Sequence, residues 1–598
     1  MCAIAGWVST APPAARRIAE MLDAQSHRGP DGSGVFEGGE DRACKGASGC
    51  DGARRVMLGH RRLAILDLSA AGRQPMTARD GRYTIVLNGE IFNYRELRGQ
   101  LGGEFRSATD TEVLLEACAA WGVEQALGAT VGMFAFALWD ERAGQLTLAR
   151  DRLGEKPLVY FDDGATLAFA SELKALTSFH DRRVDPWAAD AYLALGYVPA
   201  PLAIFQGCRK LEAGHLLQVK PGERPRIRRW WFPEHAVASC RLSHGDRLTA
   251  LRDRTGEAVR LRLRADVPVA LCLSGGVDSA AVAAECVRQE TRPEAFTVRF
   301  SPGQAEDSEV AQARLTAKRC GLRHEIIETA PLNGAHEIER LVRHYDEPFA
   351  DSSAWPSLAL AKALGGRYKV ILNGDGGDEA FGGYRHYERI AWKQAAKAAA
   401  AAAGWRDGWG GGRAGIYVQT KALFRADKRA CLLNGRGLGN ALDSLLVPGT
   451  GDAVPEPEGA LKRAMRVDRR LHLANGLTYK TDIAFGAFGI EARAPFMDHR
   501  IVEWTQNLDP HDLVRGAQKK RLFREAFRSE LPAEVLGGAK RGFGAPIESW
   551  LRGPLREWVA DVLPSPMFEA RRQLGWSGQR LWTLAVFSEW ARQWKASW

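Results

Sequence analysis

A short loop rich in glycine and serine, Ser274 to Ser279, carries groups suited to hold an anion. It follows the apolar run 268–273, which predicts a buried strand, and an alanine-rich stretch from Asp278 onward predicts a helix. Free N–H groups at a helix start and two serine hydroxyls form a cup for phosphate. No Gly-Lys-Ser/Thr follows at the spacing of a Walker loop. Taken alone, the loop fits an ordinary glycine-rich turn about as well as a phosphate site.

A second polar cluster, 373–379, follows the apolar run 369–372, which predicts another buried strand. It places the carboxylates Asp375, Asp378 and Glu379 in a glycine-rich loop. Beside a phosphate loop, such hard oxygen ligands suit Mg²⁺, because carboxylates and phosphates coordinate it jointly. A solvated acidic turn is the alternative, but three carboxylates after a buried strand favour metal or substrate binding.

Cys2 is the candidate nucleophile of the N-terminal half. Removal of the initiator Met would leave a cysteine that carries both a thiol and a free α-amine. Such an amine titrates near ~8 and can take the thiol proton through a water, so nucleophile and base come from one residue. The apolar run 3–8 predicts a strand that holds Cys2 at a sheet end. Alone, a cysteine at position 2 is usually incidental.

Further motifs in the N-terminal half favour a catalytic role for Cys2. They are, in chain order, Arg28 to Gly32, a strand 62–67 led by Arg62, Gln74 to Met76, a strand 83–87 followed by Asn88-Gly89-Glu90, a helix start at 107–112, a strand 132–140, Arg150-Asp151 and Ser171-Glu172. Together with Cys2 they resemble the class II glutamine amidotransferase domain over about residues 2 to 200.

That resemblance implies an N-terminal-nucleophile αββα sandwich. Cys2 would attack the side-chain amide of glutamine and release ammonia, leaving a glutamyl thioester for water to hydrolyse. Asn88 and the Gly89 backbone N–H would form the oxyanion hole, in which one donor can be worth ~3 kcal/mol of barrier. Arg62 would bind the α-carboxylate of glutamine, and Glu90 and Asp110 its α-ammonium. The glutamine-binding set that the resemblance implies is Arg62, Leu63, Ala64, Ile65, Leu66, Asn88, Gly89, Glu90 and Asp110.

Each of these positions also has a plainer explanation. Asn-Gly is a common hairpin turn, and Arg62 or Asp110 could be an ordinary surface charge. All the plainer explanations would have to hold at five ordered positions at once, so we expect glutaminase chemistry.

In the second half, predicted strands alternate with predicted helices. The elements are a helix at about 248–264, a strand 295–300, a helix 308–320 and a strand 324–327. This alternation predicts a parallel, doubly wound sheet with ligands at the carboxyl ends of its strands. With both polar loops, the motif 489–498 and the basic segments around Lys520 and Lys540, residues 205 to 560 closely resemble the synthetase domain of the asparagine synthetase B family.

The second resemblance implies an ATP pyrophosphatase that binds ATP and Mg²⁺ and adenylates a carboxylate. Asp278 and Asp378 would bind Mg²⁺, Asp375 would support the acyl-adenylate step, and Lys540 would neutralise pyrophosphate as it leaves. A solvated charge is the alternative for Lys540. The ATP-binding residues that the resemblance implies are Leu273, Ser274, Gly275, Gly276, Val277, Asp278, Ser279, Val298, Asn373 and Gly374.

The sequence departs from the family pattern at two positions. Asp375 stands where the family's acid loop commonly has glutamate, one methylene longer. Asp351 stands where the best-known bacterial relative carries an arginine. An aspartate cannot bind the α-carboxylate of substrate aspartate, although it could bind an ammonium or a sugar hydroxyl. The sequence therefore predicts the amidation chemistry and leaves the identity of the acceptor open.

The whole chain of 598 residues is too long for a single core. We expect a mixed α/β and α+β protein of two domains: glutaminase at 2–205, and at 206–598 an ATP-pyrophosphatase domain with a helical C-terminal part. The net charge of +10 is mild, and no basic run with interleaved aromatics predicts nucleic-acid binding. Ten scattered cysteines, no leader-like N-terminus and no apolar run of ~18 residues favour a cytoplasmic protein that is not membrane-bound.

Three segments have no predicted role: the insertion 37–51, which holds Cys44 and Cys50, the alanine- and glycine-rich stretch 395–412, and the tryptophan-rich tail beyond Pro564. For the tail, core packing or a subunit contact, such as a homodimer, is favoured over ligand binding.

The leading hypothesis is an ATP-dependent, glutamine-hydrolysing carbon–nitrogen ligase that converts aspartate to asparagine through an acyl-adenylate and tunnelled ammonia. A tunnel is needed because released ammonia would be protonated in water. The enzymatic alternative is the same amidation of a sugar acid or natural-product acid, or an intramolecular amide closure, which needs no glutamine. The non-enzymatic alternative is a nucleotide- or glutamine-sensing protein without turnover.

Overall fold

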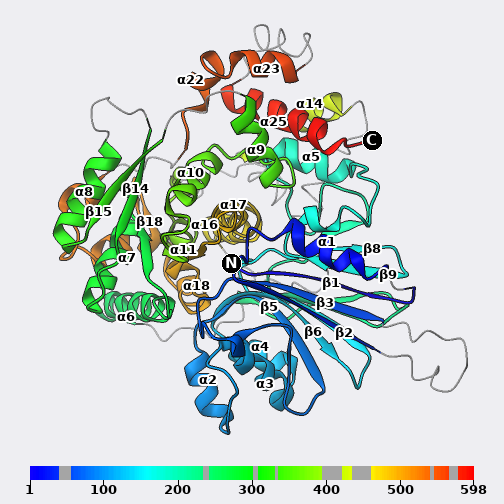
Figure 1. Cartoon of the computed structure of the whole chain (residues 1–598). Helices are drawn as coiled ribbons and strands as arrows, with labels where there is room; N and C mark the ends of the chain where they lie inside the picture. The colour runs from blue at the N-terminus through cyan, green and yellow to red at the C-terminus, as the bar shows by residue number, and fades with distance from the viewer. Residues whose placement is uncertain are drawn as a thin grey trace, which may run out of the picture.

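The computed structural model describes residues 1–11, 13–39, 55–233, 242–300, 308–329, 335–392, 421–433, 459–538, 544–563 and 577–598. Figure 1 shows two stacked sheets, blue to cyan, beside a green parallel sheet, and the red helix near the C-terminus lies at the top of the view, away from the green sheet. Most of the insertion 37–51, with Cys44 and Cys50, and all of 395–412 lie outside the described residues.

Two six-stranded antiparallel sheets pack face to face in the N-terminal half. The first has the order β10-β8-β9-β1-β3-β2 and the second β12-β11-β7-β6-β5-β4. The strands are β1 (Ala3–Ser9), β2 (Gly32–Gly38), β3 (Val56–Arg62), β4 (Met76–Thr77), β5 (Tyr83–Ile91), β6 (Gly132–Asp140), β7 (Gln145–Arg150), β8 (Val159–Asp162), β9 (Thr166–Ala170), β10 (Cys208–Lys210), β11 (His215–Val219) and β12 (Arg226–Arg229).

Helices cover both outer faces of this pair of sheets (Figure 1). Helix α1 (Arg16–Ala24) packs on β1 and β3, whereas α3 (Asp110–Trp121) packs on β5, with α2 (Tyr94–Leu101) and α4 (Val123–Ala129) beside it. Ile4 and Val8 of the first sheet meet Val86 and Ala137 of the second in a buried cluster between the sheets. The αββα sandwich expected from the sequence is confirmed.

Three local differences separate the predicted from the observed elements. The strand predicted at 62–67 is wrong: β3 ends at Arg62, and the chain leaves the sheet there. Strand β5 runs on through Asn88 and Gly89 to Ile91, so Asn-Gly is not a turn. Strands β10, β11 and β12 pair with β8, β7 and β11, respectively, beyond the expected end of the first domain at residue 205. The N-terminal sheets therefore extend to Arg229.

A five-stranded parallel sheet organises the second half. Its order is β15-β14-β13-β16-β17, formed by β13 (Val269–Cys272), β14 (Ala295–Phe300), β15 (His324–Thr329), β16 (Val370–Leu372) and β17 (Glu491–Arg493). The strand order reverses between β13 and β16. In open parallel sheets, ligands bind at the carboxyl ends of the strands at such a reversal. The two polar loops predicted from sequence, 274–279 and 373–379, lie at the carboxyl ends of these two strands.

Helices on both faces bury this sheet. Helices α6 (His244–Arg262), α7 (Val277–Arg288) and α8 (Ser308–Cys320) lie together on one side of the sheet, and α10 (Ala354–Leu364) and α17 (Thr478–Gly486) lie on the other (Figure 1). The doubly wound arrangement expected from the sequence is confirmed. Within the described residues, no helix is long and apolar enough to cross a membrane.

The tryptophan-rich tail packs inside the protein rather than on its surface. Trp582 and Trp590 on α25 (Gly578–Trp594) are buried, and the Trp590 ring N–H donates to the carbonyl of Asp346 at 2.7 Å. Trp598, at the chain end, is 45% exposed. Trp576 lies outside the described residues. Core packing therefore accounts for the two buried tryptophans, and they are not available to a partner.

Candidate active sites

Cys2 lies at the start of β1, which runs between β3 and β9 in the first sheet. The backbone N–H of Leu63, the first residue after β3, donates to Cys2 Sγ at 3.4 Å. All seven residues of β1 are buried, so the strand fixes the position of the thiol. Burial raises the pKa of the Cys2 thiol, and the charge of Asp110 adds to that effect.

Asn88 and Gly89 lie in β5, opposite Ala135 and Phe134 of β6. Asn88 is fully buried, and neither atom of its side-chain amide has a hydrogen-bond partner within the described residues. Gly89 has φ +146°, and a Cβ there would lie 2.1 Å from the Met133 carbonyl oxygen. A buried amide without partners is rare and calls for an explanation. An oxyanion that forms only during catalysis would be a suitable partner.

Two further carboxylates of the glutamine-binding set are buried beside this strand. Asp110 Oδ2 accepts from the Ile91 N–H at 2.8 Å, and burial raises the pKa of Asp110 to about 6. Glu90 Oε2 lies 3.3 Å from a guanidinium nitrogen of Arg493. Burial, and then the Asp110 carboxylate, raise the pKa of Glu90. The contact with Arg493, which belongs to β17 of the other sheet system, was not predicted from sequence.

Arg62 is placed differently from the expectation. Its guanidinium donates to the backbone carbonyls of Ser69 at 2.8 Å and Leu66 at 3.4 Å, and also to that of Asp67. These bonds fold the segment after β3 into a loop whose residues Leu63, Ala64, Ile65 and Leu66 are buried. In this structure Arg62 therefore shapes the loop beside Cys2.

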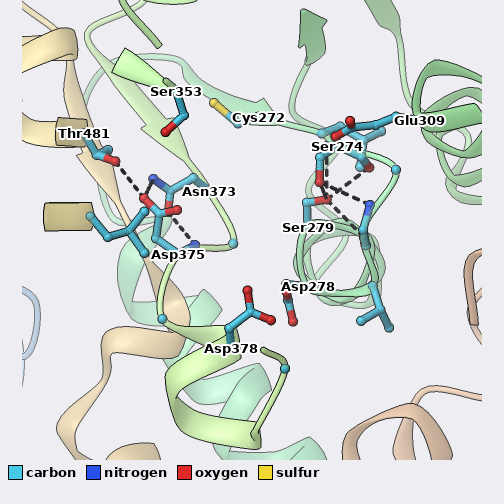
Figure 2. Close-up of a pocket in the computed structure, with 18 of the residues that line it drawn as sticks. Cys272, Ser274, Asp278, Ser279, Glu309, Ser353, Asn373, Asp375, Asp378 and Thr481 are labelled. Carbon is cyan, nitrogen blue, oxygen red and sulfur yellow. Dashed lines mark hydrogen bonds between the residues drawn. The ribbon is translucent and has the colours of Figure 1, made fainter. Parts of the chain in front are cut away.

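A cavity of about 400 Å³ opens at the carboxyl ends of β13 and β16. All ten predicted ATP-binding residues line it, together with Asp375 and Asp378. The Ser274 and Ser279 hydroxyls lie 2.9 Å apart, and the Gly276 N–H donates to Ser274 Oγ at 3.2 Å (Figure 2). A Cβ at Gly374 would lie 2.9 Å from the Ser279 backbone nitrogen, so glycine lets the two loops approach.

Asp278 and Asp378 come from different loops and point toward one another across the cavity (Figure 2). The Lys520 ammonium lies between them, 2.7 Å from Asp378 Oδ1 and in contact with the Asp278 carboxylate. Lys520 is buried, and burial lowers its pKa. Two carboxylates already arranged around one cation suit Mg²⁺, which proteins bind through one or two carboxylates plus substrate phosphates. The described residues contain no cluster of three or more His, Cys, Asp or Glu that could hold a metal by itself.

Asp375 is oriented by its neighbours. Its Oδ2 accepts from Asn373 Nδ2 at 3.0 Å and from the Thr481 hydroxyl at 2.8 Å (Figure 2). Glu379, four residues on, also lines the cavity and accepts a hydrogen bond from the Tyr384 hydroxyl. Burial raises the pKa of Glu379 to about 7. Thr481 and Tyr384 were not predicted to act here. Lys540 lies outside the described residues.

The space between the two sites is partly apolar. Met1 is fully buried in a cluster with Phe296, Val298, Leu360 and Phe485, which also line the cavity. Figure 1 marks the N-terminus between the sandwich and α17. Burial lowers the pKa of the Met1 α-amine to about 5. One chain of apolar side chains thus extends from the neighbour of Cys2 to the cavity wall.

Buried ion pairs flank this apolar region and join the two halves. Arg28 lies 2.9 Å from Glu172 and 2.7 Å from Asp482, and Lys156 lies 3.4 Å from Asp482. Asp482 belongs to α17, whereas Arg28, Lys156 and Glu172 belong to the sandwich. The sequence motifs at Arg28 and Glu172 therefore mark the interface of the two halves.

Fold and sites together define a glutamine amidotransferase domain joined to a nucleotide-binding synthetase domain. Comparison with known families agrees: the glutamine amidotransferase domain family matches residues 1–231, and the asparagine synthase family matches residues 250–594. The chain belongs to the asparagine synthase family.

Similar proteins cover nearly the whole chain. A relative in Mycobacterium tuberculosis, whose assignment as a glutamine-hydrolysing asparagine synthetase is itself provisional, is 31% identical over 96% of this chain and 93% of its own. Glutamine-hydrolysing asparagine synthetase 1 of Bacillus subtilis is 28% identical over 99% of this chain and 96% of its own. The amidase chry2 of Gibberella zeae is 28% identical over 93% and 88%, respectively.

Proposed function

We propose that this protein is a glutamine-hydrolysing asparagine synthetase. The reaction converts aspartate, glutamine and ATP to asparagine, glutamate, AMP and pyrophosphate. The observation that carries the proposal is the cavity at the sheet reversal: it gathers a phosphate loop, an acid loop and Asp375, and its apolar wall continues to the neighbour of Cys2.

The glutaminase half would act through Cys2 once Met1 has been removed. The freed α-amine of Cys2 would take the thiol proton, and the thiolate would attack the glutamine amide. The partnerless Asn88 amide and the Gly89 N–H would then stabilise the oxyanion. Glu90 and Asp110 would bind the α-ammonium of glutamine. Arg62 would bind its α-carboxylate only if glutamine displaces a loop carbonyl from the guanidinium.

The synthetase half would hold ATP with its phosphates in the loop 274–279, where the N–H groups at the start of α7 would donate to the anion. Asp278 and Asp378 would hold Mg²⁺, which when bound neutralises phosphate charge and orients the phosphates. The aspartate side-chain carboxylate would attack the α-phosphate, with pyrophosphate as the leaving group. Asp375, fixed by Asn373 and Thr481, would support this step.

Ammonia would pass from Cys2 to the acyl-adenylate along the apolar region described above. Loss of Met1 would leave vacant a fully buried position that lies next to Cys2 in the chain and packs in the same apolar cluster as residues of the cavity wall. An apolar route also keeps ammonia unprotonated, and therefore nucleophilic, until it reaches the acyl-adenylate and displaces AMP.

The test is pyrophosphate release from ATP with Mg²⁺, supplied with either glutamine or ammonium and with aspartate or a panel of other carboxylic acids. Asparagine formation with aspartate in both nitrogen regimes supports the proposal. Release with a uronic acid or a natural-product acid, and none with aspartate, would keep the amidation chemistry but transfer it to a different substrate. The amidase-named relatives lend that second candidate weak support.

A further inference from the structure

One end of the cavity carries a pair of opposite charges that the adenylation chemistry does not use. Asp351, Ser353, His472 and Lys480 all line it. Ser353 and Thr481, the residue after Lys480, lie across the cavity from the Ser274 and Ser279 hydroxyls (Figure 2). The pair is therefore on the acceptor side of the cavity, away from the phosphate loop.

Lys480 is a buried cation with no carboxylate in direct contact within the described residues. It is 6% exposed, and within the described residues its ammonium has no hydrogen bond and no carboxylate within 4.0 Å. The other three lysines that are buried to this degree each contact a carboxylate: Lys156 contacts Asp482, Lys210 contacts Glu347, and Lys520 contacts Asp278. A buried charge is costly unless it is paired. Since Lys480 faces the cavity, the missing partner is a ligand anion.

The Asp351 carboxylate is held in place through one of its two oxygens, and the other is available to accept a hydrogen bond. Its Oδ1 accepts from the Ser353 N–H at 2.8 Å and from the Ser353 hydroxyl at 2.6 Å. Its Oδ2 receives no hydrogen bond within the described residues. Burial opposes ionisation of Asp351, but the Lys480 charge and the Ser353 hydrogen bonds outweigh it and keep its pKa below the ordinary value.

Among the described residues that line this end of the cavity, Lys480 is the only lysine or arginine. Burial lowers the pKa of His472 to about 4, so its ring is neutral at pH 7. Lys520 is already engaged by Asp278 and Asp378 at the phosphate side. An anion bound near Asp351 would therefore rely on Lys480.

We propose that Lys480 and Asp351 form the recognition site for the α-amino-acid head of the acceptor. Lys480 binds the α-carboxylate, and Asp351 Oδ2 accepts a hydrogen bond from the α-ammonium. The inference rests on the proposed function and adds a substrate class to it: an amino acid with a side-chain carboxylate, rather than a sugar acid. Asp351 cannot bind a carboxylate itself, but Lys480 on α17 supplies the positive charge.

Selectivity arises because the ligand must offer a carboxylate to Lys480 and an ammonium to Asp351 at the same time. A zwitterion pairs Lys480 and Asp351 together and leaves its side-chain carboxylate free to reach Asp375 and the phosphate loop. A uronic acid lacks the ammonium, so it would leave the Asp351 carboxylate in the cavity without an ionic partner. Rejection of a ligand that leaves a charge in the site unpaired is a source of specificity.

The test uses full-length protein in the ammonium-dependent assay, so that the glutaminase site is not involved. The variants are Lys480→Met, Lys480→Arg and Asp351→Asn, with Lys362→Met as control, since Lys362 is an exposed lysine on α10. We expect the first and third to raise KM for aspartate about 10- to 100-fold, with KM for ATP within about twofold of wild type. Lys480→Arg should restore a large part of the affinity, and the control should change neither constant.

Two truncated acceptors separate recognition from general damage. Succinate lacks the α-ammonium, and 3-aminopropionate lacks the α-carboxylate. In Asp351→Asn the wild-type preference for aspartate over succinate should shrink at least about tenfold, and in Lys480→Met the preference over 3-aminopropionate should shrink equally. A merely structural role would weaken all three acceptors alike.

The outcomes distinguish the two proposals. Aspartate turnover with unchanged KM in both variants, or equal losses for all three acceptors, overturns the head-group site and leaves the asparagine synthetase assignment intact. Turnover of a uronic acid without turnover of any amino acid overturns both. Aspartate turnover with the matched losses supports both.

Discussion

The two active sites of this chain are built in opposite ways. The glutaminase site lies on regular antiparallel strands: Cys2 precedes a fully buried strand, and Asn88 and Gly89 lie inside β5. The synthetase site lies on loops that follow parallel strands, where glycines such as Gly374 allow close backbone approach. In the first site, the buried Asn88 amide has no hydrogen-bond partner within the described residues. In the second, the residues of the acid loop already bond to each other, as the Asn373–Asp375–Thr481 set shows.

This difference predicts which substitutions will lower activity without lowering the free energy of unfolding. A residue that waits for its ligand can be removed with little loss of folding free energy, because no bond in the resting protein is broken. Removing a residue that holds another side chain in place should lower both the activity and the free energy of unfolding. The predictions below use this contrast, from the largest expected effect to the smallest.

The largest effect is expected from Cys2→Ala. Glutamine-dependent asparagine formation should fall at least about 10⁴-fold, because no nucleophile remains. Ammonium-dependent formation should stay within about twofold of wild type, since the synthetase cavity lies on another sheet system. The measurement is asparagine yield with each nitrogen source. Equal loss in both regimes would mean that the two regions do not act separately.

The converse variant is Asp278→Asn. It removes one of the two cavity carboxylates that point toward one another (Figure 2), on a different sheet from the one that holds Cys2. We expect adenylation to fall roughly a thousandfold, consistent with several kcal/mol of lost transition-state stabilisation. Glutamine hydrolysis measured as glutamate release should persist. Gln312→Ala serves as a matched control, since Gln312 lines the same cavity and, within the described residues, its side-chain amide bonds only to the carbonyl of Glu534.

Asn88→Ala tests whether the buried side-chain amide of Asn88 acts as an oxyanion donor. Glutaminase kcat should fall about 100- to 1,000-fold, because an oxyanion donor is lost. The free energy of unfolding should change little, because the side-chain amide of Asn88 has no partner within the described residues. Denaturant unfolding of wild type and variant checks the second part. In contrast, Asn373→Ala should destabilise the acid loop, because it breaks bonds to Asp375. Similar losses of unfolding free energy in Asn88→Ala and Asn373→Ala would contradict the proposed difference between the two sites.

Sequence alone predicted much of the loop-built site, since its determinants are local. Loops 274–279 and 373–379 each follow an apolar strand, and every predicted ATP-binding residue lines one cavity. The sequence analysis did not predict Lys480 as a site residue. Lys480 reaches the cavity from α17, about two hundred residues after the phosphate loop 274–279, and no local motif identifies it.

In the strand-built half, sequence predicted the strands better than their ends. The apolar run after Arg62 was predicted as strand, yet the chain turns there because Arg62 binds three carbonyls of the following loop. Asn88-Gly89 was weighed as a turn but stays in the sheet, since Gly89 fits where a Cβ would meet the Met133 carbonyl. Contacts across the interface, such as Glu90 with Arg493, depend on how the halves pack and leave no trace in either segment.

The smallest effect concerns the pH dependence of glutamine binding. Burial raises the pKa of Asp110 to about 6, against the opposing hydrogen bond from Ile91. Below that pH the carboxyl becomes neutral and no longer attracts the α-ammonium of glutamine. KM for glutamine should therefore rise about tenfold per pH unit below pH 6, because one proton is bound, and should stay flat between pH 7 and 8. Steady-state glutaminase assays from pH 5 to 8 measure this dependence.

Asp110→Asn assigns the titration to its group. Glu90, Glu491 and Arg493 share the same buried network, so another carboxyl could in principle contribute. The variant should have a raised KM at pH 7.5 that no longer changes on acidification. Persistence of the acid limb in Asp110→Asn would assign it to Glu90, whose pKa is also raised by burial. The loop-built site offers the control: KM for ATP in the ammonium-dependent assay should not follow the Asp110 titration, because Asp110 does not line the cavity.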